Sequence, residues 1–239
     1  ISYGGVNGQA VSIRVARYVG SGGTGCASTA WTCTVVDDGS NVGSYSSIAF
    51  DNNGNPWISY SDNSNADLYV ARYVGSGGTG CTSGAWTCTA VETTDSVGTY
   101  TSIAIDTNGN PWVSYNKFTG NDLKVARYVG NGSGSGCASS DWTCTAVDTT
   151  NLVGINTSIA IDSSGNPWVS YFDDTNDDLR VARYVGGSSG SGCASSDWTC
   201  SAVATNSAGD YSSVAFDLSG VPWVSYRSIA STTLQVAKL

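Results

Sequence analysis

Short runs of β-branched and aromatic residues, each bounded by Gly, Asn, Asp or Ser, recur along the whole chain. In one representative stretch these runs read SIAID (102–106), PWVSY (111–115), LKVARYV (123–129) and WTCTAV (142–147). Runs of this length and composition predict β-strands separated by turns. No stretch shows the periodicity of an amphipathic helix, and helix-forming residues are scarce. The pattern therefore predicts an all-β chain.

The four-strand pattern is repeated with a period of 55–56 residues. Four strands per repeat, arranged radially, are typical of the blades of a β-propeller, and a ring leaves only short sheet edges exposed. We predict a single propeller domain over 1–239 with about four to five blades. Its approximate repeat units are 1–46, 47–101, 102–157, 158–212 and 213–239.

The strand count is not a multiple of four. The chain opens with ISY, which matches the end of PWVSY, and closes with LQVAKL, which matches LRVARYV. The expected order is three strands, then three sets of four, then three, about 18 in all, whereas a closed ring of five four-stranded blades needs about 20. The incomplete terminal blades suggest strand exchange between subunits. A truncated or incompletely known chain explains them equally well.

A ten-residue segment, DTNGNPWVSY at 106–115, recurs in four copies of the pattern Asp-x-x-Gly-x-x-Trp. We expect the aspartate to accept hydrogen bonds from its own turn and the glycine to supply the positive φ that the turn needs. The turn residues are Asp51, Gly54, Asp106, Gly109, Asp162, Gly165, Asp217 and Gly220.

SIAIDTNGNPWVSY resembles the strand–turn–strand unit of NHL-type and periplasmic sensor-type propellers. It is also similar to the Asp box of sialidase-type propellers, but it has two residues rather than one between Asp and Gly. The resemblance covers roughly a quarter of each repeat and implies the propeller architecture. It implies no particular activity, since such propellers include lyases, sensors, lectins and scaffolds.

The composition restricts the partners and the compartment. Charged residues make up 12% of the chain and the net charge is −9, which argues against nucleic acid or an anionic membrane as a partner. No apolar run approaches the ~20 residues of a membrane helix. The chain begins with Ile1 and contains no methionine, so we expect a mature or excised chain. Eight cysteines in so polar a chain indicate an oxidising compartment, so we expect a secreted, extracellular or cell-surface protein.

The cysteines occur as C-x6-C, once per repeat, and pairing within each copy treats all copies alike. The expected disulfides join Cys26 to Cys33, Cys81 to Cys88, Cys137 to Cys144 and Cys193 to Cys200. Zinc binding and redox chemistry are the alternatives, but their usual spacings, C-x2–4-C and C-x-x-C, are missing. Candidate glycosylation sites are the sequons at Asn131 and Asn156, with O-linked sugars on 28–34 and 93–101 as a further alternative.

Catalytic chemistry finds little support, because the chain has no histidine and its repeats are nearly equal. A sialidase-like site would need an arginine cluster, and four arginines share the context V-A-R-Y: Arg17, Arg72, Arg127 and Arg183. We expect them instead to pack between blades and to pair with the turn aspartates. An acidic run offers calcium ligands as an alternative to a solvated loop, at Asp173, Asp174, Asp177 and Asp178.

We therefore predict a non-enzymatic extracellular structural protein without a cofactor, one that associates with copies of itself and is completed by strands of its neighbours, for example in a filament. The alternative is a multivalent lectin, with glycans as partners and weak equivalent sites that gain by avidity. Its sugar sites would use aromatic side chains such as Trp57, Trp112, Trp168 and Trp223, although their alternation with serine is more typical of core positions. A hydrolase or lyase is a third interpretation.

Overall fold

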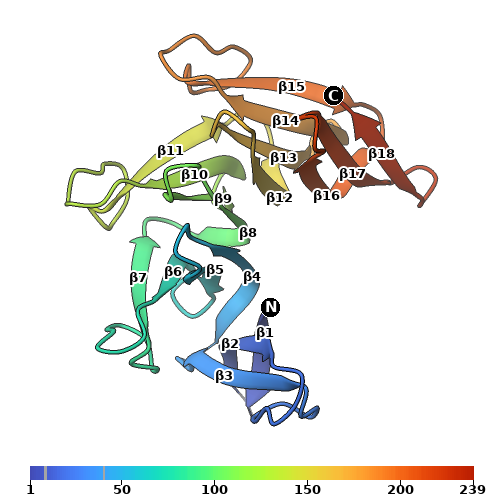
Figure 1. The fold of residues 1–239 in the computed structure, drawn as a ribbon. Helices are drawn as coiled ribbons and strands as arrows, with labels where there is room; N and C mark the ends of the chain where they lie inside the picture. The colour runs from blue at the N-terminus through green and yellow to red at the C-terminus, as the bar shows by residue number, and fades with distance from the viewer. Residues whose placement is uncertain (8–9, 40) are drawn as a thin grey trace.

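The computed structural model describes residues 1–7, 10–39 and 41–239. These residues form eighteen strands in five antiparallel sheets, with three strands in the first and last sheets and four in each of the others (Figure 1). The predicted all-β fold and the predicted order of three, four, four, four and three strands are confirmed. No helix among the described residues is long and apolar enough to cross a bilayer.

The strands of each sheet follow one another in chain order as a meander. Sheet 1 holds β1 (Ser2–Asn7), β2 (Ala10–Tyr18) and β3 (Trp31–Asp37). Sheet 2 holds β4 (Val42–Phe50), β5 (Pro56–Asp62), β6 (Asp67–Tyr73) and β7 (Trp86–Glu92). Sheet 3 holds β8 (Val97–Ile105), β9 (Pro111–Lys117), β10 (Asp122–Tyr128) and β11 (Trp142–Asp148). Sheet 4 holds β12 (Val153–Ile161), β13 (Pro167–Asp173), β14 (Asp178–Tyr184) and β15 (Trp198–Ala204). Sheet 5 holds β16 (Ala208–Phe216), β17 (Pro222–Ser228) and β18 (Leu234–Lys238).

The five sheets succeed one another around an open arc, with sheet 1 in blue at one end and sheet 5 in red at the other (Figure 1). The first strands of sheets 2 to 5, namely β4, β8, β12 and β16, pack against one another along the inside of the arc. Meandering sheets that pack face to face around a common centre are the blades of a β-propeller. Close strand packing among the described residues joins each sheet to the next one along the chain.

The hydrophobic core lies between sheets. One cluster joins Trp112 and Leu123 of sheet 3 to Val169, Tyr171 and Trp198 of sheet 4. Equivalent clusters join sheet 2 to sheet 3 and sheet 1 to sheet 2. Because each sheet buries its apolar face only against a neighbour, the stability of one sheet depends on the next, as in other repeat proteins.

The sheets of repeats 2 to 5 begin about five residues before the predicted repeat boundaries. The inner strand of sheet 3, predicted to start at residue 102, begins at Val97. Its register against β9 shifts on both sides of Thr99, and both Gly98 and Tyr100 have positive φ, at 86° and 53°. Bulges of this kind interrupt the alternation of buried and exposed residues, so the segment VGTY resembles a turn in sequence although it continues the strand.

Candidate functional site: the spaces between successive sheets

The repeated turn is a closed hydrogen-bonded unit. Asp106 Oδ1 accepts hydrogen bonds from the backbone N–H groups of Asn108 and Asn110, both at 2.9 Å. Its Oδ2 accepts the indole N–H of Trp112 at 3.1 Å, a contact that the sequence did not suggest. Gly109 adopts a φ of 85°, as the turn requires. The same bonds recur at Asp51, Asp162 and Asp217.

These hydrogen bonds also affect the ionisation of the turn aspartates. Partial burial raises the pKa of Asp162, but bonds from the Asn166 and Ser164 backbones and from the Trp168 indole outweigh it and lower the pKa below its ordinary value. The pKa of Asp51 is lowered in the same way. Both oxygens of each turn aspartate are occupied by the turn itself, so the repeated motif is a structural element of the blade.

The expected ion pairs between the V-A-R-Y arginines and the turn aspartates do not form. The Arg127 guanidinium lies over the Trp112 ring, with its Cζ atom 4.9 Å from the ring centroid. Arg72 stacks on Trp57 and Arg183 on Trp168 in the same way, at 5.1 and 5.2 Å. Cross-strand register explains the difference, because each arginine is directly opposite its tryptophan on the neighbouring strand. The turn aspartate of each of these repeats already accepts a hydrogen bond from the indole N–H of the same tryptophan.

Two equivalent pockets open between sheets 2 and 3 and between sheets 3 and 4. The first has a volume of about 170 Å³ and the second about 130 Å³. Each is lined by the tryptophan and arginine of one sheet, by two threonines of that sheet's last strand, and by a tyrosine, an aspartate and a tryptophan of the next sheet. These residues are Trp57, Arg72, Thr87, Thr89, Tyr128, Asp141 and Trp142 in the first pocket, and Trp112, Arg127, Thr143, Thr145, Tyr184, Asp197 and Trp198 in the second.

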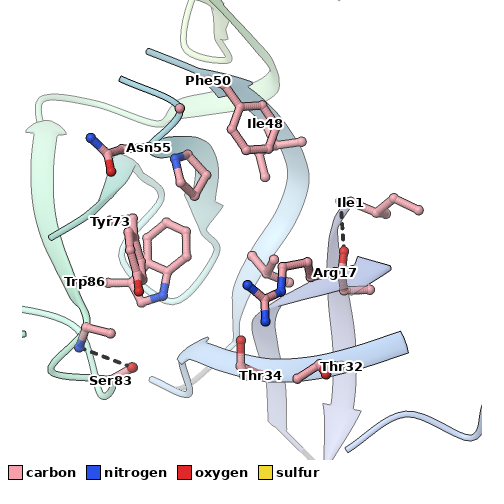
Figure 2. A pocket seen from close by; sticks show the side chains of 15 residues that line it. Ile1, Arg17, Thr32, Thr34, Ile48, Phe50, Asn55, Tyr73, Ser83 and Trp86 are labelled. Atoms are coloured by element: carbon pink, nitrogen blue, oxygen red, sulfur yellow. Dashed lines mark hydrogen bonds between the residues drawn. The ribbon is translucent and has the colours of Figure 1, made fainter. Parts of the chain in front are cut away.

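The space between sheets 1 and 2 is larger, about 460 Å³. Figure 2 shows the Arg17 guanidinium pointing into it, toward Tyr73 and Trp86, with Ile48 and Phe50 on another side. Ile1 pairs with Ala16 as Ile58 pairs with Ala71, so no residue of this sequence stands where Trp57 stands in the next pocket.

Acid–tyrosine contacts join successive sheets inside the core. The Tyr171 hydroxyl of sheet 4 donates to Asp148 Oδ2 of sheet 3 at 2.7 Å, and Asp148 is fully buried. Arg180 lies 3.5 Å from the same oxygen. Burial, followed by the negative charge of Asp148, raises the pKa of Tyr171 above its ordinary value, so the phenol stays protonated and acts as the donor.

The same contact occurs at two other interfaces with different neighbours. Tyr60 donates to Asp37 at 3.1 Å, and Tyr115 donates to Glu92, which is also paired with Lys124. Burial and the neighbouring carboxylates raise the pKa of both tyrosines. At the interface of sheets 4 and 5 the acid is replaced by Ala204, which occupies the register position of Asp148. These groups connect sheets and do not line the two equivalent pockets.

Each of the four disulfides joins the two cysteines of one repeat, as the spacing suggested. The bridges fasten the Gly/Ser-rich loop before the fourth strand of the blade, where Gly136 also forms an isolated bridge with Thr143. Of the two sequons, Asn131 is exposed in such a loop. Asn156 is half-buried, and its amide nitrogen donates to Asp210 Oδ1 at 2.7 Å. Asn131 is therefore the better placed acceptor for an N-linked sugar.

The aspartates of the acidic run at the turn between β13 and β14 differ in burial. Asp173 is fully buried, accepts bonds from Thr175 and Asn176, and lies 3.6 Å from Arg180. Asp174 and Asp177 are exposed at the surface of the turn. Across the described part of the chain, no group of three or more acidic or cysteine residues has an arrangement that could hold a metal ion.

The two end sheets expose aromatic residues that are covered elsewhere in the arc. In the interior, Trp57 stacks on Tyr128 of the next sheet with centroids 5.4 Å apart, and Trp112 stacks on Tyr184 at 5.3 Å. Their equivalents are Trp223 of sheet 5, which is 39% exposed, and Tyr18 of sheet 1, which is 65% exposed. Trp168 is the equivalent tryptophan of sheet 4, and it contacts Phe216 of sheet 5 in place of a tyrosine.

The pocket aspartates Asp141 and Asp197 were not singled out from the sequence. They precede the tryptophan of the W-T-C strand, where the first two repeats have Ala30 and Ala85. That difference between otherwise similar copies is the signal that could have identified them. Sequence patterns alone did not assign a site role to the tryptophans at this position, such as Trp142, yet they line the pockets.

Comparisons with known proteins add little beyond the fold. A scan against protein-family models and a search of curated proteins both found no match. Among solved structures, a GH43 β-1,3-galactosidase with galactodeoxynojirimycin is 9% identical, with a TM-score of 0.44 over 88% of this chain and 79% of its own. A fucose lectin from Kordia zhangzhouensis in complex with methyl-fucoside is 14% identical, with a TM-score of 0.38 over 66% of this chain and 99% of its own. An exo-β-1,3-galactanase from Clostridium thermocellum is 11% identical, with a TM-score of 0.39, and although 96% of this chain is covered the match spans only 52% of the galactanase. Identities and scores this low leave the function to the chain's own residues.

Proposed function

We propose that this protein is a non-enzymatic extracellular structural module whose copies associate head to tail. The observation that carries the proposal is the pair of complementary aromatic faces at the two ends of the arc. Exposed Trp223 has the position of the tryptophan that contacts the next sheet, and exposed Tyr18 has the position of the tyrosine that such a tryptophan contacts. The same two halves meet inside the arc as Trp57 with Tyr128 and as Trp112 with Tyr184.

The surroundings of the two exposed residues reproduce the interior interface. Lys238 lies over the Trp223 ring at 5.5 Å, as Arg127 lies over Trp112. Tyr18 packs edge-on against Trp31 at 5.3 Å, as the corresponding tyrosines pack against the last-strand tryptophans of sheets 2 to 4. A surface built like a core interface lowers its free energy by covering its aromatic area, since apolar surface prefers to leave water.

Such a contact is heterologous, because one copy contributes sheet 5 and the next contributes sheet 1. Heterologous contacts produce rings when their rotation closes and open filaments when it does not. Sheets 1 and 5 lie at opposite ends of the arc in Figure 1, so a second copy can supply the contact without any change to the internal interfaces. The four disulfides support an oxidising, extracellular location for this assembly.

The test is the oligomeric state by light scattering over a concentration series, together with negative-stain imaging. The wild-type chain is expected to form oligomers that grow with concentration, and Tyr18→Ser to remain monomeric. Phe118→Ser is the matched control, because Phe118 is 63% exposed in the turn after β9 and lies away from both end faces, so this variant should assemble like the wild type. A wild-type chain that stays monomeric at all soluble concentrations would rule the proposal out.

A carbohydrate-binding role is favoured independently by the two polar pockets between sheets 2, 3 and 4. Their walls combine aromatic rings with an arginine, an aspartate and threonine hydroxyls. Sugar binding does not require self-association, and the two functions are compatible in one extracellular module.

A further inference from the structure

We infer that the pocket between sheets 2 and 3 and the pocket between sheets 3 and 4 each bind one neutral sugar ring, so that the chain carries two equivalent saccharide sites. The inference starts from the position of the pockets, which lie inside the arc and are built wholly from complete sheets. It is therefore independent of how the end sheets associate.

The second pocket contains a polar atom that has no partner. Arg127 Nε is buried and makes no hydrogen bond among the described residues. Its guanidinium is held over Trp112, which orients it along the pocket wall. The Nε atom itself is covered, so an acceptor supplied from outside the chain would meet the other N–H groups of this guanidinium, whose residue lines the pocket. A hydroxyl or ring oxygen of a ligand would be such an acceptor.

The opposite wall supplies the complementary group. Asp197 lines the same pocket, and one of its oxygens is occupied by the Ser188 backbone N–H at 2.8 Å. No ion pair joins Asp197 to Arg127 in the described part of the chain. In the other pocket Asp141 is held in the same way by the Gly132 N–H at 2.9 Å, across from Arg72. Each pocket thus contains a carboxylate held by a backbone N–H group and a guanidinium that forms no ion pair with it.

A ligand that joins these walls must both accept and donate hydrogen bonds and carry no net charge. Vicinal hydroxyls on a sugar ring satisfy both requirements, since each hydroxyl is donor and acceptor at once. Thr143 and Thr145 add further hydroxyl partners, and the rings of Trp112 and Tyr184 offer apolar faces to the sugar C–H groups. Volumes of about 170 and 130 Å³ lie well below the roughly 300–1,000 Å³ of sites for drug-sized ligands and suit a single ring.

The other interfaces lack this combination of groups. Between sheets 1 and 2, Ala85 takes the position of the pocket aspartate. At the interface of sheets 4 and 5, the three described strands of sheet 5 include no counterpart of the W-T-C strand. The described residues therefore form this combination of groups twice, and not in the wider space between sheets 1 and 2.

The indole N–H signals of the eight tryptophans, assigned from single Trp→Phe variants, give a direct test by NMR. The probes are methyl glycosides of neutral hexoses and 6-deoxyhexoses, titrated one at a time. Binding of at least one probe should shift the signals of the four pocket tryptophans and leave those of Trp31 and Trp223 in place. The pocket tryptophans are Trp57, Trp112, Trp142 and Trp198.

The double variant Asp141→Asn with Asp197→Asn keeps the shape of both pockets and removes both carboxylates. It should weaken binding on the order of 10- to 100-fold, as expected for loss of a hydrogen bond to a charged group. Asp38→Asn is the matched control, since Asp38 is an exposed aspartate outside both pockets, and it should bind like the wild type. Binding that survives the double variant, shifts centred on Trp86 in the space between sheets 1 and 2, or no response to any probe would each overturn the inference.

Discussion

Replacement of Tyr171 by phenylalanine tests whether the buried acid–tyrosine contacts hold successive sheets together. Tyr171 is fully buried and donates to Asp148 at 2.7 Å across the interface of sheets 3 and 4. The substitution removes only the hydroxyl, so the packing of the ring is kept. Tyr226→Phe is the natural control, because Tyr226 occupies the same position in sheet 5, and Ala204 of sheet 4 stands where sheet 3 has Asp148. Tyr226 and Ala204 pack against the same core cluster.

The expected cost follows from the groups that remain. Asp148 keeps its contacts with Arg180 at 3.5 Å and with the Thr150 backbone N–H at 3.1 Å, so its charge is not left unpaired. The hydroxyl also accepts a hydrogen bond from Arg180 Nε at 3.2 Å, but Arg180 keeps Asp148 and Asp173 as partners. Losing the hydrogen bond to the charged Asp148 should lower the free energy of unfolding by about 1.5–3 kcal/mol. For a chain of this size that corresponds to a fall in Tm of roughly 3–12 °C. The control should change the free energy by less than about 0.5 kcal/mol.

The assay is thermal unfolding followed by tryptophan fluorescence and near-UV circular dichroism under non-reducing conditions. Both variants must show the far-UV spectrum of the wild type before heating. A Tm for Tyr171→Phe that equals that of Tyr226→Phe would mean that the buried contact contributes no more than a tyrosine hydroxyl without an acid partner, and would rule out a stabilising role for it.

Three further predictions concern the disulfides, pH and the turns. Replacing Cys137 and Cys144 by serine opens a loop of about eight residues and should lower stability by about 2.5 kcal/mol, measured as a fall in Tm of roughly 5–10 °C by calorimetry. The folded-state pKa values of Tyr60, Tyr115 and Tyr171 are raised. The contribution of these tyrosines to stability is therefore complete below pH 10 and is lost as the pH rises above 10, where the tyrosines of the unfolded chain ionise. Denaturant midpoints measured on either side of pH 10 should show this loss, and a flat profile would contradict it. Gly109→Ala should cost about 1–2 kcal/mol in chemical denaturation because of its φ of +85°, whereas Gly84→Ala, with no positive φ and open space around it, should cost nothing.

Much of the fold was predictable because the same strand and turn patterns recur in four copies along the chain. Strand type, strand order and the turn at Asp106 all follow from patterns within ten residues. The start of the inner strand was not predictable in this way, because positive φ at Gly98 and Tyr100 is stabilised by packing on the neighbouring sheet, where Gly98 lies against Leu68 of sheet 2. A residue that resembles a turn locally can continue a strand when a second sheet supports it.

The candidate sites were harder to predict, because they lie between residues of different repeats. The stacking of Arg127 on Trp112 depends on cross-strand register, which the sequence does not give directly. The pairing of Tyr115 with Glu92 joins two sheets, and nothing in either segment alone points to the other. The difference between Ala85 and Asp141 was visible in the sequence, but its meaning required the pocket that Asp141 lines.

Whether the exposed faces of sheets 1 and 5 meet between copies can be tested by a single cross-linking measurement. All described cysteines are paired in disulfides, so a variant with Ala30→Cys and Val236→Cys introduces the only free thiols in that part of the chain and leaves Tyr18 and Trp223 in place. The equivalent residues at the interior interface, Asp141 and Val70, line one pocket. On mild oxidation, non-reducing electrophoresis should show a ladder of covalent multimers, with each single-cysteine variant as the control. A cross-link confined to one chain, or no cross-link under conditions in which the chain is concentrated, would contradict the account.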